Sequence, residues 1–208
     1  MTTNYDKIAT NYDLISRIIF GKNLVEAQVC LLKYVPNNSR VLIAGGGTGW
    51  ILEEFTKIHP QGLIIDYVES SAKMIALSKK RNYASNKINF INLPIENYST
   101  DEKYDIILTP FFFDNFTVNK IQTIFNRLNN LLKNDGTWLY VDFVYDENKK
   151  PLWQKALLKI MYLFFRITSK IETQELVNME FFFKPLYNKV VEVSHYHNFI
   201  KSIVYKKQ

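Results

Sequence analysis

An apolar run that leads into closely spaced glycines constrains the fold of this chain more than any other feature. Residues 41–50 read Val-Leu-Ile-Ala-Gly-Gly-Gly-Thr-Gly-Trp, and residues 50–58 then follow an amphipathic helical pattern. The apolar residues predict a buried strand, and the glycines permit a turn in which a ligand lies against bare backbone at the N-terminus of the helix. The segment therefore predicts a strand–loop–helix unit with a ligand site or, as the alternative, a tight turn without one.

The glycine spacing bears on the kind of ligand. Gly45, Gly47 and Gly49 alternate, whereas the dinucleotide fingerprint Gly-x-Gly-x-x-Gly would place its last glycine where Trp50 stands. This departure argues against NAD and favours another adenosine cofactor. An NAD-linked enzyme is kept as an alternative.

An acidic residue at the end of the second expected strand supports a ligand site. Residues 62–68 predict that strand, and Glu69 follows it, about 20 residues beyond the glycines, where an acid can accept hydrogen bonds from ribose hydroxyls. Ser70–Ser71 can cap a helix over residues 71–82. Asp66 is the rival acid, but it lies inside the strand, with its side chain on the opposite face from Glu69. We therefore expect Glu69 to contact the ribose.

Strand and helix patterns alternate along most of the chain, which predicts a parallel sheet covered by helices on both faces. The expected strands are residues 40–44, 62–68, 88–92, 104–109 and 137–143, and the expected helices are residues 50–58, 71–82 and 117–133. Residues 190–195 and 199–205 predict two further strands that form a hairpin. No repeat or linker divides the 208 residues, so we expect a single domain over residues 1–208.

Composition narrows the class of protein. Apolar residues make up 47% of the chain and aromatic residues 15%, which is typical of a globular protein with a large core. The net charge of +6 is spread along the chain, so no nucleic-acid partner is expected. The single cysteine, Cys30, excludes an internal disulfide. With no signal-peptide pattern and no apolar stretch of spanning length, the expected location is the cytoplasm.

Several segments in order resemble the class I methyltransferases that depend on S-adenosylmethionine (SAM). The likeness lies in Val41–Gly49, Tyr67–Arg81, Ile88–Asn92, Tyr104–Phe116 and Leu131–Gly136. The opening, Tyr5–Ile15, is similar to the N-terminus of the ubiquinone/menaquinone-type small-molecule methyltransferases. The resemblance implies an α/β fold: a Rossmann-like, doubly wound, mostly parallel seven-stranded sheet with a C-terminal antiparallel hairpin. It implies SAM as the cofactor and S-adenosylhomocysteine (SAH) as its product.

The resemblance also implies roles for individual residues. The glycine loop would hold the methionine part of SAM, Glu69 its ribose, and Met74 or Ile95 would flank the adenine. The residues expected to bind the cofactor are Gly45, Gly46, Gly47, Gly49, Glu69, Ser70, Met74, Ile95, Thr109, Pro110, Tyr5 and Tyr12. Tyr5 and Tyr12 are two helical turns apart, so they share a face of an N-terminal helix. Residues 1–35 are accordingly expected to form a helical lid, although two packing rings are the alternative.

Two positions depart from the family pattern. Ile43 stands where the family usually has an acidic residue within the first strand, and residues 93–95 read Leu-Pro-Ile where an Asp often follows the third strand. Both changes replace polar contacts with apolar side chains. They motivate the alternative of a catalytically silent methyltransferase-like domain that binds a partner through a helix over residues 151–171.

Candidate catalytic residues lie at the carboxyl ends of the expected strands. Asp142 ends the fifth strand, and His195 and His197 are expected on one face of the hairpin, where imidazole is a natural proton acceptor near neutral pH. Exposed turn residues are the alternative for the histidines. Phe111–Phe113 predict either an aromatic wall that attracts a sulfonium or a core plug, and Asp114 either a base or a helix cap. No spaced ligand group predicts a metal site.

The segment after the fifth strand is expected to lie beside the acceptor. Lys155, Lys159 and Arg166 fall on one face of a helix whose remaining face is apolar and aromatic. Such a helix can rest on a membrane surface, roof a pocket, form a dimer face or be buried in the protein. We expect residues 151–185 to form a helical insertion on the substrate side. The expected reaction is methyl transfer from SAM to a small, hydrophobic or aromatic acceptor.

Overall fold

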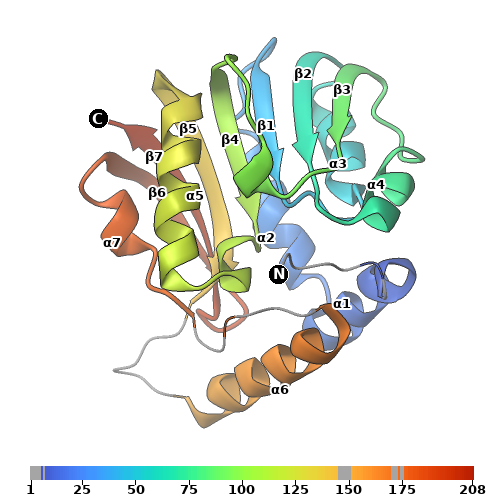
Figure 1. The fold of residues 1–208 in the computed structure, drawn as a ribbon, viewed down its shortest axis with the longest axis vertical. Helices are drawn as coiled ribbons and strands as arrows, with labels where there is room; N and C mark the ends of the chain where they lie inside the picture. The colour runs from blue at the N-terminus through green and yellow to red at the C-terminus, as the bar shows by residue number, and fades with distance from the viewer. Residues whose placement is uncertain (1–5, 7, 145–150, 170–172, 174–175) are drawn as a thin grey trace.

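A seven-stranded sheet in the order β3-β2-β1-β4-β5-β7-β6 forms the centre of the protein (Figure 1). The computed structural model describes residues 6, 8–144, 151–169, 173 and 176–208. The strands are β1 (Arg40–Ala44), β2 (Gln61–Val68), β3 (Ser85–Ile91), β4 (Tyr104–Pro110), β5 (Leu132–Phe143), β6 (Tyr187–His195) and β7 (Ile200–Lys207). The helices are η1 (Ala9–Asn11), α1 (Tyr12–Phe20), α2 (Asn23–Leu32), α3 (Trp50–Ile58), α4 (Ala72–Ser78), η2 (Ile95–Asn97), η3 (Phe113–Asn115), α5 (Val118–Leu131), α6 (Leu152–Ser169) and α7 (Glu180–Phe183).

The strand pairing confirms the expected fold class. β1 lies between β2 and β4, with Val41 opposite Ile65 on one side and Ile106 on the other, and both pairings are parallel. β3 and β5 extend the parallel sheet on either side. β7 runs antiparallel to both β5 and β6, so the chain ends in the expected hairpin.

Helices cover both faces of the sheet, which explains why its strands are apolar runs rather than alternating ones. On one face Leu31 of α2, Phe55 of α3 and Ile75 of α4 join the same buried cluster as the strands. On the other face Phe125 of α5 and Phe183 of α7 pack around the buried Trp138. The doubly wound arrangement therefore has a core on each side of the sheet.

Two element boundaries differ from the expectation. α4 ends at Ser78 rather than near residue 82, and its N-terminus is capped by Ser71, whose hydroxyl accepts a hydrogen bond from the Met74 N–H at 3.1 Å. β5 begins directly after α5, at Leu132 rather than at residue 137, so residues 134–136 lie within the strand. The ladder between β4 and β5 is irregular at this point, which accommodates the extra residues.

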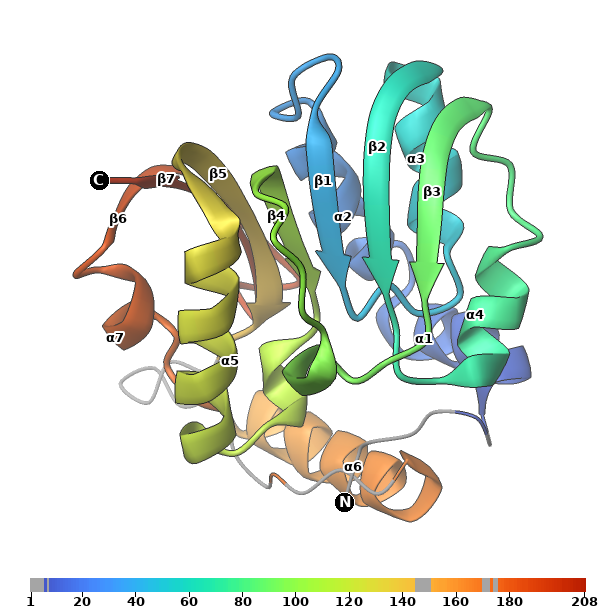
Figure 2. The ribbon, with the colours of Figure 1, turned by 45° about the horizontal axis from the view of Figure 1, so that its top comes forward.

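The N-terminal segment divides into two parts. Ala27, Leu31 and Leu32 of α2 are completely buried, so α2 belongs to the core rather than to the expected lid over residues 1–35. η1 and α1 remain, and Figure 2 shows α1 beyond the carboxyl ends of the parallel strands. That edge of the sheet is where ligands bind in open α/β folds.

The expected insertion over residues 151–185 also divides. α6 lies beyond the carboxyl ends of the strands (Figures 1 and 2), with Gln154 and Met161 buried and Leu152 and Ile160 exposed. α7 packs instead against the sheet, where the Phe183 ring stacks on Tyr205 at a centroid distance of 4.0 Å. Within the described residues, no helix combines the length and apolar character that a membrane span requires.

Candidate active site

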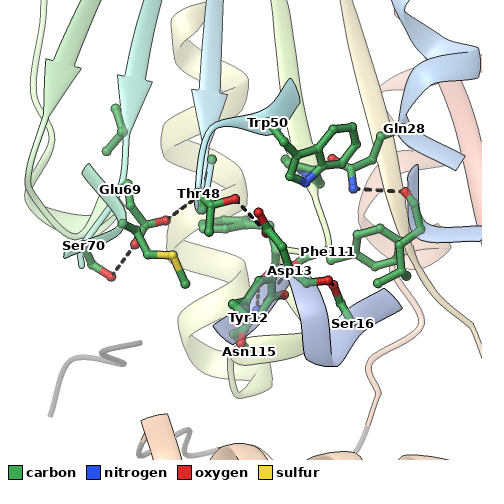
Figure 3. A pocket seen from close by; sticks show the side chains of 18 of the residues that line it. Tyr12, Asp13, Ser16, Gln28, Thr48, Trp50, Glu69, Ser70, Phe111 and Asn115 are labelled. Atoms are coloured by element: carbon green, nitrogen blue, oxygen red, sulfur yellow. Dashed lines mark hydrogen bonds between the residues drawn. The ribbon is translucent and has the colours of Figure 1, made fainter. Parts of the chain in front are cut away.

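A pocket opens at the carboxyl ends of β1, β2, β3 and β4, with α1 and the first turns of α2 beside it (Figure 3). The loops after the four strands contribute Gly45, Gly46, Gly47, Thr48, Trp50, Glu69, Ser70, Met74, Leu93, Pro94, Ile95, Glu96, Pro110, Phe111, Phe112, Asn115 and Phe116. The helices contribute Tyr12, Asp13, Ser16, Arg17, Leu24, Val25 and Gln28. Most of the expected cofactor residues therefore gather in one place, and Tyr5 lies outside the described residues.

The glycine loop presents bare backbone to the pocket at one position in particular. Gly47 has a φ of 64°, and a Cβ added to it would meet no atom within 4 Å, so the space in front of it is open. Gly49 has a different use, because a Cβ there would collide with Ser78 of α4. Gly49 allows α3 and α4 to pack closely and does not line the pocket, contrary to the expected ligand contact.

Glu69 places a carboxylate next to this loop. Its side chain is 7% exposed and accepts hydrogen bonds from the Gly47 N–H at 3.1 Å and the Ser71 N–H at 2.8 Å. Burial raises the pKa of Glu69, and the backbone hydrogen bonds oppose that rise. The site therefore holds a strong hydrogen-bond acceptor beside the open backbone of Gly47.

Asp66 points away from the pocket. Its carboxylate accepts hydrogen bonds from Arg40, Asn89 and Tyr104. Burial opposes the ionisation of Asp66, but these hydrogen bonds outweigh burial and lower its pKa. The two acids of this strand thus have separate surroundings, as expected from their opposite faces.

Three residues far apart in the sequence fasten α1 over the glycine loop. Asp13 of α1 accepts hydrogen bonds from the Thr48 hydroxyl at 2.7 Å and from Nη2 of Arg81 at 2.9 Å. Nε of Arg81 also donates to the Thr48 carbonyl at 3.1 Å. The sequence alone does not reveal this cluster, because no local pattern indicates that the three residues meet.

The phenylalanine triplet divides between pocket and core. Phe111 lines the pocket and has a φ of 48°, a left-handed conformation that costs a bulky residue about 1–3 kcal/mol and clusters at functional sites. Its N–H donates to the Val141 carbonyl at 2.8 Å, which helps to hold this backbone. Phe112 is buried in the core and also lines the pocket, and Phe113 is buried in the core below. The wall and the core plug were alternatives, and the triplet forms both.

Thr109 and Asp142 lie beneath the pocket rather than on its surface. The Thr109 hydroxyl accepts a hydrogen bond from Trp138 Nε1 at 3.0 Å, so it faces the core and does not line the pocket. Asp142 is 2% exposed and accepts hydrogen bonds from the backbone N–H groups of Phe113 and Phe143. Burial raises the pKa of Asp142 to about 7. Its carboxylate thus holds the segment that carries Phe111, and its side chain does not line the pocket.

The two histidines are separated by the conformation of the hairpin turn. Tyr196, His197 and Asn198 all have positive φ values, so the alternation of side chains that predicted a shared face ends at His195. Nε2 of His195 lies 3.8 Å from the Cys30 sulfur, whereas the His197 ring packs 5.9 Å from Trp153 of α6. The expected shared face is therefore not formed, and neither imidazole lines the pocket.

No metal site accompanies these groups in the described part of the chain, where no three His, Cys, Asp or Glu side chains come together as ligands would. Described side chains of α6 are likewise absent from the pocket lining. Among the described residues, the helices that border the pocket are α1 and α2 instead.

The comparison of this chain with known proteins is consistent with the site described above. A family model described as a methyltransferase domain matches residues 41–136. The chain therefore contains a SAM-dependent methyltransferase domain over these residues. The resemblance seen in the sequence is thereby confirmed.

Two curated relatives illustrate the family. The malonyl-[acyl-carrier protein] O-methyltransferase of Bacillus cereus is 29% identical over 144 residues, which are 67% of this chain and 51% of that protein. The ubiquinone/menaquinone biosynthesis C-methyltransferase of Geotalea daltonii is 29% identical over 146 residues, or 67% of this chain and 61% of that protein. The methyltransferase chain thus spans about half the length of the first relative.

A solved structure supports the fold. The mitomycin 7-O-methyltransferase MmcR superimposes with a TM-score of 0.70 at 14% sequence identity, over 99% of this chain and 61% of that one. The overall fold of this chain is therefore shared with that methyltransferase.

Proposed function

We propose that this methyltransferase transfers the methyl group of SAM to a small acceptor with a hydrophobic or aromatic body. The observation that carries the proposal is the pairing of two environments in one pocket. In Figure 3, Glu69 and Ser70 lie on one side, and Trp50, Gln28 and Phe111 lie on the other. The first environment suits a hydroxyl-rich cofactor, and the second suits an apolar acceptor.

The residues on the first side fit SAM. The open space in front of Gly47 admits a ligand against the backbone, and Glu69 offers carboxylate oxygens to ribose hydroxyls. Met74 and Ile95 are buried side chains at the pocket wall and would flank the adenine. Ile43 of β1 is fully buried. It stands where the family usually has an acid, and an apolar side chain there needs no polar partner.

The chain's own contribution to the reaction is alignment and exclusion of water. SAM, when bound, supplies an electrophilic methyl group on a positively charged sulfur. The faces of Trp50 and Phe111 attract positive charge, and a fixed orientation of the two reactants accounts for much of the rate of such a transfer. Asp142 acts through the backbone by holding the segment that carries Phe111.

The same proposal gives α1 the role of a lid. Tyr12 and Asp13 lie over the glycine loop, and Asp13 is held there by Thr48 and Arg81. Release of these hydrogen bonds would open a path for SAM, and their return would close the site. Because Cys30 is a free thiol, the proposed location is the reducing cytoplasm.

Isothermal titration calorimetry with SAM, SAH and NAD tests the proposal. We expect SAM and SAH to compete for one site per chain and NAD to show no binding. A second assay follows transfer of a labelled methyl group from SAM to small aromatic acceptors, which distinguishes an enzyme from a catalytically silent binding domain. Absence of SAH binding to the folded protein would overturn the proposal.

A further inference from the structure

A cationic side chain lines the pocket where helices α1 and α2 cover it. Among the described residues that line the pocket, Arg17 of α1 is the only one with a cationic side chain. In the described part of the chain no acid lies within ion-pair distance of its guanidinium. Asp13, one helical turn earlier, is the natural partner by spacing. Its two oxygens are instead occupied by Thr48 and Arg81.

The acid on the cofactor side does not compete for Arg17 either. Both oxygens of Glu69 accept backbone hydrogen bonds, one from Gly47 and one from Ser71. Arg17 lies in the last turn of α1, directly before α2, and Gln28 of α2 lies on the side of Trp50 and Phe111 in Figure 3, away from Glu69 and Ser70. Arg17 therefore belongs to the end of the pocket that α2 borders, on the side away from Glu69.

A second polar group on this side is also available. Gln28 of α2 is 7% exposed, and its amide nitrogen donates to the Leu24 carbonyl at 3.1 Å. Its amide oxygen accepts no hydrogen bond from the described residues, so it is free to accept one from a ligand hydroxyl or N–H. The remaining walls near it, Trp50 and Phe111, are aromatic.

We infer that the acceptor is a small carboxylic acid with an aromatic or other apolar body, and that Arg17 determines this specificity. A single guanidinium presents two parallel N–H donors that match one planar carboxylate. A phosphate would call for further donors, and the acceptor side offers no other cation. The inference rests on the proposed function, because it concerns the second substrate of that same site.

Calorimetry on the SAH-saturated protein tests the inference. The probes are 4-hydroxybenzoate and indole-3-acetate, each compared with its neutral amide, 4-hydroxybenzamide or indole-3-acetamide. We expect each acid to bind about tenfold more tightly than its amide, which is the order of effect of one charge-assisted hydrogen bond at a partly exposed site. Arg17→Gln should remove this preference and leave the affinity for SAH unchanged.

Two variants control the experiment. Arg17→Lys keeps the positive charge but not the two parallel N–H donors, and it should retain part of the preference. Lys22→Gln removes a neighbouring cation that does not line the pocket, and it should behave as the wild type. If SAH binds but acids bind no better than amides, or if Arg17→Gln keeps the preference, the inference is overturned. Loss of SAH binding in the wild type would instead overturn the proposed function itself.

Discussion

Replacement of Glu69 by Ala is the sharpest test of how the protein holds its cofactor. The Glu69 carboxylate is 7% exposed and uses one lone pair on each oxygen for the N–H groups of Gly47 and Ser71. Oε1 also accepts a long hydrogen bond from the Ser70 hydroxyl at 3.4 Å, whereas Oε2 keeps a further lone pair for a ribose hydroxyl. Hydrogen bonds to a charged group contribute about 1.5–3 kcal/mol. Their loss therefore predicts a roughly 10- to 100-fold weaker affinity for SAM and SAH.

The protonation state of Glu69 adds a second signature. Because burial raises its pKa, the carboxylate takes up a proton at a higher pH than an ordinary glutamate. A protonated carboxyl is a weaker acceptor for ribose hydroxyls, so the affinity for SAM should fall as the pH falls through this raised pKa. Glu69→Gln should bind SAM weakly at every pH and should lose the pH dependence.

The assay is calorimetric titration of SAH between acidic and neutral pH, with urea unfolding to confirm that each variant is folded. Asp66→Asn is the matched control, because Asp66 lies in the same strand region and its carboxylate is bound by Arg40, Asn89 and Tyr104. It should lower the free energy of unfolding and leave the SAH affinity of the folded protein intact. Normal affinity in Glu69→Ala together with loss of affinity in Asp66→Asn would refute the reasoning.

Three further predictions follow from the site. Gly47→Val should abolish SAM binding in calorimetry, because its side chain would enter the open space of the cradle and its φ of 64° disfavours a branched residue. Asp13→Asn and Arg81→Gln should be non-additive by about 1 kcal/mol in a urea double-mutant cycle, a modest value because both side chains are partly exposed. The His195→Gln/His197→Gln double variant should keep its turnover and pH–rate profile, since neither imidazole lines the pocket; a lost slope near neutral pH would contradict this.

Local pattern was enough to predict the sheet and several residues that line the pocket. The features behind this prediction lie close together in the sequence: the apolar run of β1, the glycines after it and the acid after β2. Each requires a specific backbone conformation or a specific degree of burial. Side-chain alternation alone predicted that Glu69 and Asp66 lie on opposite faces, because this alternation holds inside a regular strand. The order of parallel strands then places the glycine loop and Glu69 at the same edge.

Tertiary structure decided what local pattern left open. The direction of Thr109 depended on Trp138, which approaches it from the neighbouring strand β5. The separation of His195 from His197 depended on three successive left-handed residues, a conformation that sequence alternation does not anticipate.

The helices that cover the pocket show most clearly which features the sequence predicts and which depend on the folded chain. The sequence by itself predicted helices near the N-terminus and a pocket at the carboxyl ends of the strands. Only the folded chain brings Asp13 to Thr48 and Arg81, so that among the described residues no acid pairs with the neighbouring Arg17. Contacts between residues dozens of positions apart depend on how whole elements pack, and no periodicity within one segment records them.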